Sequence, residues 1–219
     1  MIFDKSLNLV NQIFLINMNY AYDIFISYRR DDLTKAWIEK HFVPLLDSHV
    51  FYELGRHPVF YIDLQLESGT TWPIALGNAL GTCKTIIPLW SKTYLNSVWC
   101  ACEISHMLER EIKTGFRTLQ QPEGLVFPTI IHDGETMPIN LSSIQKVEIQ
   151  DCFNVKMSPD SPKAELLSDK LKPLGKAIAN VLDKAPDCQA DWKIDTANTF
   201  FKQFYINTQA QQTQTPKFI

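Results

Sequence analysis

The sequence predicts an α/β fold in which helices cover both faces of a parallel β-sheet. Short runs rich in β-branched and aromatic residues alternate with segments whose apolar residues recur at helical spacing. This alternation is typical of parallel strands joined by right-handed helical crossovers. The runs that predict strands are residues 22–28, 59–64, 84–90, 125–131 and 146–150.

The first strand and the helix after it are marked by their apolar residues. Residues 22–28 read Tyr-Asp-Ile-Phe-Ile-Ser-Tyr, a run that suits a buried strand. Residues 34–48 carry apolar side chains at helical spacing, so we expect a helix there that Pro44 kinks or shortens.

Prolines, glycines and hydroxyl residues place the ends of the middle elements. Thr71 can cap the second helix, Pro73 falls in its first turn, and Gly81 marks its end. In the next strand, Pro88 indicates an end or a bulge, because proline cannot donate a hydrogen bond to the sheet. Ser97 is the expected cap of the helix that follows.

The last two elements are an edge strand and a long helix. Residues 146–150 are more polar than the other strands, so we place them at an edge of the sheet. The closing helix presents one apolar stripe. The stripe consists of Leu167, Leu171, Leu174, Ile178, Val181 and Leu182.

Length and composition favour one domain with extensions. The chain has 219 residues, of which 45% are hydrophobic, enough for a packed core. Its net charge is −3, whereas nucleic-acid-binding proteins usually carry a net positive charge. We divide the chain into an N-terminal extension (1–21), a core domain (22–185) and a C-terminal extension (186–219). The last contains a short amphipathic helix, expected to pack on its own domain, and a disordered Gln/Thr-rich end.

Cysteine usage and hydropathy indicate a cytoplasmic protein. The five cysteines are odd in number and irregularly spaced, so they indicate buried thiols in a reducing compartment, not disulfides or a zinc site. No apolar run is long enough to cross a bilayer, and the N-terminus lacks the pattern of a signal peptide. We therefore expect no metal, no membrane and no nucleic-acid partner.

A crevice beyond the carboxyl ends of the strands is the expected functional site of such a sheet. This rule points to the loops after Tyr28, Leu64 and Trp90. The other residues expected near the mouth of the crevice are Ser27, Asp63 and Leu66.

Three segments, residues 22–32, 63–80 and 90–103, carry a family resemblance. The third ends in Trp-Cys-Ala-Cys-Glu at positions 99–103, a Trp-Cys-x-x-Glu run that is the most specific of the matches. Together they resemble the opening strand, the BB loop with its helix, and the third strand and following helix of bacterial TIR (Toll/interleukin-1 receptor) domains. The resemblance spans residues 22–184.

This resemblance implies a flavodoxin-like, doubly wound sheet of five parallel strands. It also implies one of two activities. Some TIR domains cleave NAD, releasing nicotinamide and leaving ADP-ribose or a cyclic isomer, and in these the essential residue matches Glu103. Others only assemble signalling complexes. Similarity to TIR NADases of anti-phage defence further implies self-assembly and a separately encoded effector or sensor protein.

The chemistry of NAD cleavage suits a single carboxylate. Nicotinamide departs as a neutral molecule, so no strong general acid is needed, and the ribose becomes oxocarbenium-like and cationic. A carboxylate such as Glu103 can stabilise that charge. Trp99 lies four residues earlier, on the same helical face, and can wall the crevice; from spacing alone, a core tryptophan and a surface glutamate are the commoner interpretation.

Several neighbouring residues have two interpretations each. Arg29 can bind the pyrophosphate of NAD or pair with an aspartate of the following loop. Tyr28 can stack on a base or pack in the core. His106 can tune Glu103, although a surface position is the commoner case. The sequence has no glycine-rich phosphate cradle, so NAD is expected as a substrate and not as a bound cofactor.

Two other functions stay open. In the loop at residues 67–73 the proline is displaced from the family's usual Pro-Gly position, which bears on self-association. A non-catalytic interaction module is the main alternative to the enzyme. A nucleoside-processing transferase on a related fold is the weaker one.

Overall fold

A five-stranded parallel sheet forms the centre of the molecule. The computed structural model describes residues 19–62, 72–189 and 192. The strand order is β2-β1-β3-β4-β5, and every pairing is parallel. The strands are β1 (Tyr22–Tyr28), β2 (Phe60–Ile62), β3 (Cys83–Trp90), β4 (Thr129–Ile130) and β5 (Val147–Glu148). This confirms the predicted doubly wound sheet, with the more polar fifth strand at an edge.

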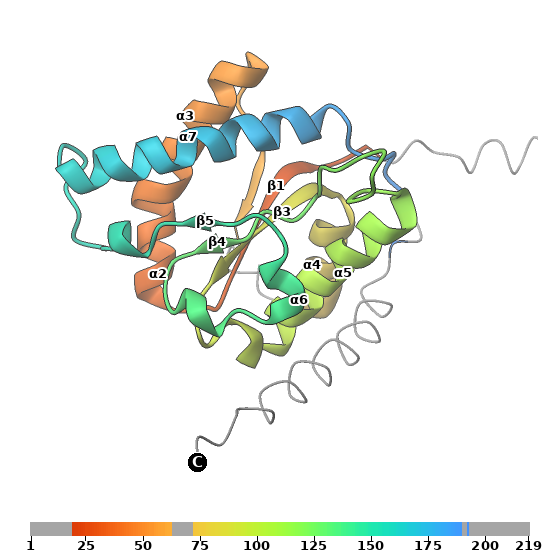
Figure 1. Cartoon of the computed structure of the whole chain (residues 1–219), viewed down its shortest axis with the longest axis horizontal. Coiled ribbons are helices and arrows are strands. Elements are labelled where there is room, and N and C mark those ends of the chain that lie inside the picture. Colours follow the sequence, from red (N-terminus) through yellow and green to blue (C-terminus); the bar gives the residue numbers. More distant parts are fainter. Residues whose placement is uncertain (1–18, 63–71, 190–191, 193–219) are drawn as a thin grey trace, which may run out of the picture.

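Helices cover both faces of this sheet (Figure 1). One face carries α2 (Asp32–Trp37), α3 (Val43–Leu54) and α7 (Pro162–Leu182), and the other carries α4 (Trp72–Gly81), α5 (Val98–Thr114) and α6 (Ile139–Ser142). Each face has its own cluster of buried apolar side chains. In β1, Ile24 and Ile26 belong to the first cluster and Phe25 to the second, as expected of a strand that is buried on both sides.

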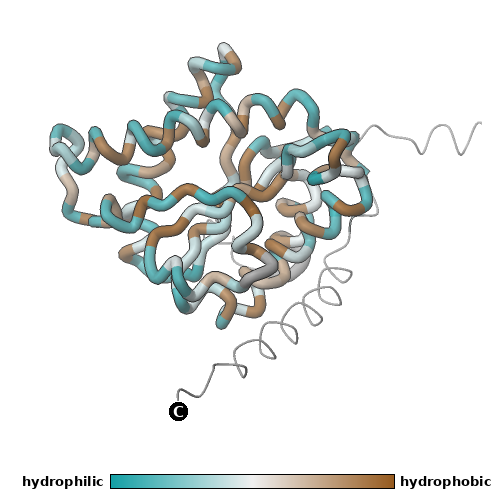
Figure 2. Tube along the Cα trace, in the orientation of Figure 1, coloured by the Kyte–Doolittle hydropathy of each residue, from teal (hydrophilic) through white to brown (hydrophobic). Residues whose placement is uncertain are grey.

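The closing helix α7 was predicted correctly from its apolar stripe. All six residues of the stripe are buried, and α7 packs along α3. Apolar and polar stretches alternate along α7 in Figure 2, because one side of the helix faces the core and the other faces water.

The first helical segment is longer and less regular than predicted. A π-helical turn at Ile38–Phe42 separates α2 from α3, and Pro44 lies in the first turn of α3. The irregular turn comes before Pro44, which does not shorten the helix, so the predicted shortening and the end at residue 48 are both wrong. The helix continues to Leu54, where Gly55 ends it with a φ of 70°.

Pro88 does not end or bulge its strand, so that prediction is wrong. It lies inside β3 and pairs with Ser27 of β1. On the other side of β3, the pairs Ile86↔Val126 and Leu89↔Thr129 share one register. Pro88 therefore interrupts only the hydrogen bonding toward β4, because it has no N–H to offer that neighbour. This explains why β4 is shorter than the predicted strand at residues 125–131.

The ends of the two helices beside the site are mostly as expected. Ser97 caps α5, since its Oγ accepts from the N–H of Cys100 at 3.4 Å. Pro73 falls in the first turn of α4, and α4 ends at Gly81. The predicted cap Thr71 lies outside the described residues.

Tyr20 and Trp192, one from each predicted extension, lie together. Their ring centroids are 6.3 Å apart. The Trp192 ring also lies 3.8 Å from the Cζ of Arg110, a cation–π contact that ties it to α5. This tail residue thus packs on its own domain. The boundaries at residues 21 and 185 stay predictions, and the predicted tail helix and disordered end lie almost wholly outside the described residues.

A buried carboxylate anchors the amino end of β1. Asp23 accepts from both guanidinium nitrogens of Arg56, at 2.6 and 2.9 Å, and from the N–H of Val59 at 2.9 Å. Burial acts to raise the pKa of Asp23, but the bonds from Arg56 and Val59 outweigh burial and hold this pKa below its ordinary 3.8.

We predict that Asp23→Asn lowers the free energy of unfolding at pH 7 by about 1–3 kcal/mol. In acid, the variant and the wild type should become more similar in this free energy. A lowered folded-state pKa means that the stabilisation is present above pH 3.8 and is lost as the pH falls through the folded value. Urea unfolding at pH 7 and at pH 3 measures this. The exposed Asp160, changed to Asn, is the control. A difference that stays constant with pH would contradict the prediction.

Candidate functional site

Glu103 is buried where α5 passes the carboxyl end of β1. The α5 helix brings its first turns against the sheet, and the Glu103 side chain is only 6% exposed there. The Oγ of Ser27, the second-last residue of β1, donates to Glu103 Oε2 at 2.5 Å. The structure therefore joins two of the predicted site residues, which are 76 positions apart in the sequence.

Tyr94 extends this hydrogen-bonded group. It lies in a 3-10 turn (Tyr94–Asn96) between β3 and α5 and is fully buried. Its hydroxyl lies 2.5 Å from Ser27 Oγ and 3.3 Å from the carbonyl oxygen of Cys100. Burial raises the pKa of Tyr94 well above 10, so the phenol stays protonated at neutral pH.

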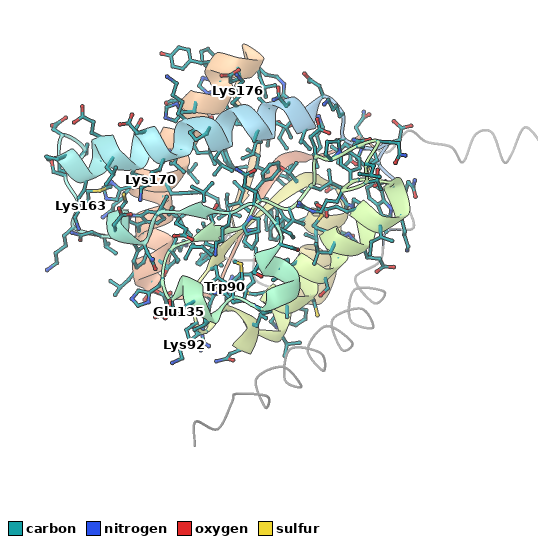
Figure 3. All side chains as sticks on the ribbon, in the orientation of Figure 1. Trp90, Lys92, Glu135, Lys163, Lys170 and Lys176 are labelled. Carbon is teal, nitrogen blue, oxygen red and sulfur yellow. The ribbon has the colours of Figure 1, made fainter. Side chains whose placement is uncertain are left out.

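A crevice opens beyond the carboxyl ends of β1, β3 and β4. It includes the predicted loops after Tyr28 and Trp90, and the predicted loop after Leu64 lies outside the described residues. The cavity has a volume of about 250 Å³. Its polar lining includes Arg29 and Asp31 from the loop after β1, Lys92 from the loop after β3, and His132 and Asp133 from the loop after β4. Figure 3 shows Lys92 and Glu135 at this end of the molecule, with Trp90 further inside. Glu103 does not line this cavity.

Arg29 and Lys92 bring two positive charges to the crevice, and Asp31 and Asp133 bring two negative ones. Arg29 is exposed, and its Nη1 donates to the carbonyl oxygen of Thr93 at 3.5 Å. The alternative partner Asp31 is engaged elsewhere, because it caps α2 and accepts from the N–H and hydroxyl of Thr34 at 2.8 and 2.6 Å. Anion binding by Arg29 stays a prediction, as does its alternative of pairing with Asp31 or Asp32.

The remaining predicted site residues have different positions. Tyr28 is 6% exposed and packs in the core beside α2 and α7, which supports the packed alternative over base stacking. Its carbonyl oxygen accepts from the thiol of Cys100 at 3.3 Å. Trp99 is 37% exposed, so it is not the core residue that spacing alone favours. Asp63 and Leu66 lie outside the described residues.

His106 is not a surface residue, so that preference was wrong. It is 5% exposed, and its Nε2 lies 2.9 Å from Nη2 of Arg110. A guanidinium only donates, so this nitrogen of His106 accepts. Arg110, 1% exposed, also donates to the carbonyl oxygens of Leu80 and Cys83, at 2.9 and 2.5 Å. The sequence did not identify Tyr94 and Arg110 as important, because no local pattern marks contacts between residues that are far apart in the sequence.

A larger cavity lies away from this site. It measures about 650 Å³ and lies between α7, β5 and the segment around residues 122–128. Its charged groups already have partners, since Arg117 binds Glu111 and Lys170 binds Asp151. The smaller crevice fits a ligand better, because it lies at the topological switch point between β1 and β3.

Among the residues that the structure describes, no cluster of three or more His, Cys, Asp or Glu side chains is placed to hold a metal. The same part of the chain contains no helix with the length and apolar character needed to span a bilayer. All five cysteines are free thiols.

The chain is similar to a known family and to curated plant proteins. The sequence model of the TIR domain family matches residues 24–167, more than half of the chain. TMV resistance protein N of Nicotiana glutinosa is 30% identical over 100 residues, 45% of this chain but 8% of that protein. The protein SUPPRESSOR OF npr1-1, CONSTITUTIVE 1 of Arabidopsis thaliana is 27% identical over 111 residues, 51% of this chain and 6% of that protein. The chain thus corresponds to less than a tenth of each relative.

Solved structures are also similar. One of them is described as the activated Roq1 resistosome, directly recognizing the pathogen effector XopQ, and the matched part is its TIR domains. The match is 20% identical and covers 85% of this chain and 99% of that chain, with a TM-score of 0.35.

Proposed function

The chain belongs to the TIR domain family, and on that premise we propose that it is an enzyme that cleaves the bond between ribose and nicotinamide in NAD. In hydrolysis, water adds to the anomeric carbon as the carbon–nitrogen bond breaks. The bonding pair leaves with neutral nicotinamide, one proton is released, and ADP-ribose remains. Attack by a group of the same molecule, in place of water, gives a cyclic isomer.

The observation that carries this proposal is the position of Glu103. A carboxylate that is 6% exposed and oriented by Ser27 costs little reorganisation when positive charge develops beside it. The low local dielectric also makes its attraction for a cationic ribose stronger than in water. Glu103 lies at the carboxyl end of the sheet, the end at which the crevice opens.

The crevice supports the phosphate part of the substrate. Arg29 and Lys92 supply two positive charges from two different loops. The two aspartates of the lining are engaged by other residues, Asp31 by Thr34 and Asp133 by His132. A guanidinium binds phosphate oxygens through its forked donors, and an ammonium does so as a point charge. We therefore assign the pyrophosphate of NAD to this crevice, with Trp99 as a wall for the nicotinamide half.

We predict that Arg29→Ala weakens NAD use mainly through KM, by about tenfold, a loss typical of one exposed charge-assisted contact. The arginine is expected to bind the phosphates equally in the ground state and the transition state, so kcat should change little. Initial rates over a range of NAD concentrations measure both constants. The exposed neighbour Arg30, changed to Ala, is the control; an equal effect of both changes would argue against the assignment.

Chromatography of NAD incubated with the concentrated wild-type protein tests the proposed activity. The expected result is nicotinamide in the same amount as ADP-ribose and its cyclic isomers together. The ratio of linear to cyclic product shows which nucleophile is used. Intact NAD, in conditions under which light scattering shows the protein to be assembled, would overturn the proposal.

A non-catalytic assembly module is the second candidate. The exposure of apolar side chains at the first turns of two helices favours it: Leu33 of α2 is 66% exposed and Val98 of α5 is 62% exposed. An interaction module would assemble equally well after Glu103→Ala, and assembly would fail on changes in residues 67–73. Light scattering of these variants separates the two candidates.

The biological setting is also a proposal. We place the activity in immune signalling against phage in a bacterial host, with self-assembly and a separately encoded sensor or effector. The name of the Nicotiana glutinosa relative, which refers to virus resistance, supports an immune setting. NAD consumption by infected cells that express the wild-type protein or a Glu103 variant would test it.

A further inference from the structure

Ser27 links Glu103 to Tyr94 in a hydrogen-bonding group whose two hydroxyl hydrogens can be followed one by one. Ser27 Oγ lies 2.5 Å from Glu103 Oε2 and 2.5 Å from the Tyr94 hydroxyl. The Tyr94 hydroxyl also lies 3.3 Å from the carbonyl oxygen of Cys100. Ser27 is 1% exposed and Tyr94 is fully buried, so the group is shielded from bulk water.

When Glu103 is ionised, the direction of these bonds is determined. A carboxylate only accepts, so Ser27 must give its single hydrogen to Glu103. The bond between Ser27 and Tyr94 then needs its hydrogen from Tyr94. The tyrosine hydroxyl thereby orients the serine, and the serine orients the carboxylate.

When Glu103 holds a proton, the same atoms can bond in the opposite direction. The carboxyl group donates to Ser27, Ser27 donates to the Tyr94 oxygen, and the Tyr94 hydrogen turns to the Cys100 carbonyl oxygen. In both directions every hydroxyl hydrogen has an acceptor. Neither protonation state therefore leaves a buried donor unsatisfied, which would cost about 1–3 kcal/mol.

We propose that Tyr94 is a positioning residue that acts on Glu103 through Ser27, and that the two hydroxyl groups reverse their hydrogen bonds when Glu103 gains or loses a proton. This proposal rests on the proposed function for its catalytic meaning. In catalysis, the reversal lets Glu103 accept a proton from the attacking water and release it later without a change in heavy-atom positions.

The two thiols and the phenol nearest to Glu103 stay neutral at neutral pH. Cys100 and Cys102 flank it on α5, and Tyr94 faces it from the turn before the helix. Burial is the largest cause that raises the pKa of each of the three, to about 11 for Cys102. His106, on the next turn of α5, uses its Nε2 to accept from Arg110.

Carbon-13 NMR of the full chain tests the relay without any need for activity. In the wild type, the carbonyl signal of Cys100 should change with pH at the same midpoint as the Glu103 carboxyl signal, because the Tyr94 hydrogen reaches that carbonyl only when Glu103 is protonated. In Tyr94→Phe the Cys100 response should be lost. The phenyl ring keeps the packing on Trp90, whose centroid lies 5.4 Å away.

Ser27→Ala should change the Glu103 titration midpoint and kcat by more than Tyr94→Phe does. It removes the donor to the carboxylate, so the Glu103 midpoint should move to higher pH, and by more than in Tyr94→Phe. On NAD, kcat should fall by about 100-fold for Ser27→Ala and about tenfold for Tyr94→Phe, while KM stays near the wild-type value. Ser105→Ala, at a fully buried serine of the same helix, is the matched control and should change none of these quantities.

The outcomes separate this relay from the proposed function. A Cys100 signal that follows Glu103 equally in the wild type and in Tyr94→Phe would overturn the relay, whatever the activity. A coupled signal in a protein that leaves NAD intact would support the relay and refute the enzyme. A Glu103 midpoint unchanged in Ser27→Ala would overturn the role of both hydroxyls.

Discussion

Arg110→Met should lower the free energy of unfolding by about 3–5 kcal/mol, the size of effect seen when a buried polar network is broken. Arg110 is 1% exposed and joins the end of α4 to the start of β3 through the carbonyl oxygens of Leu80 and Cys83. Burial lowers the pKa of Arg110 to about 10, so it is still charged at pH 7. Methionine fills much of its volume but leaves those carbonyl oxygens without this donor.

Thermal and urea unfolding measure this effect. For a domain of this size, the melting temperature should fall by roughly 10 °C. Arg30→Ala, at an exposed arginine, should change it little. If both variants unfold like the wild type, Arg110 is not the anchor that its contacts describe, and the packing of Trp192 on it has no role in stability.

The fold could be predicted largely from local patterns. Each strand of a parallel sheet that is buried on both faces reads as a short apolar run, and residues 22–28 are the clearest case. The stripe of α7 repeats at helical spacing, because one face of that helix packs on α3 and the sheet. Pro73 and Gly81 act through backbone conformation, which depends on residue type more than on distant contacts.

The wrong predictions concern residues whose surroundings are formed by segments far away in the sequence. Pro88 was expected to end β3 or to form a bulge in it. The proline lacks only the hydrogen bond that its N–H would give toward β4, and β3 continues past it because the pairing with β1 is kept. His106 was expected at the surface, yet it is buried and its Nε2 lies 2.9 Å from Nη2 of Arg110. Tyr94 lies 67 positions from Ser27, so its contact with the site depends on the tertiary fold and on no local spacing.

The candidate site could be predicted in part. Glu103 was identified from the Trp-Cys-x-x-Glu run, and Ser27 from its place at the end of the first strand. The two were expected in the same crevice, and the structure joins them by a direct hydrogen bond. Neither residue lines the crevice that the structure describes. Glu103 reaches Ser27 because α5 packs on β1 and β3.

Glu103→Gln should reduce the rate of nicotinamide release by about 100- to 1,000-fold, the range for loss of one preorganised electrostatic group. Glutamine has the same shape, and its amide oxygen can accept from Ser27, so the fold should be kept. What is lost is the negative charge that stabilises the cationic ribose in the transition state. The KM for NAD should change little, since the ground state carries no such charge at the ribose.

The most direct test is the initial rate of nicotinamide release at saturating NAD, measured side by side for the wild type, Glu103→Gln and Glu109→Gln. Glu109 lies on the same helix, in a surface ion pair with Lys113 at 2.9 Å, and serves as the matched control. We predict rapid release by the wild type and by Glu109→Gln, and almost none by Glu103→Gln at an unchanged melting temperature. A Glu103→Gln rate equal to that of the wild type would contradict the account.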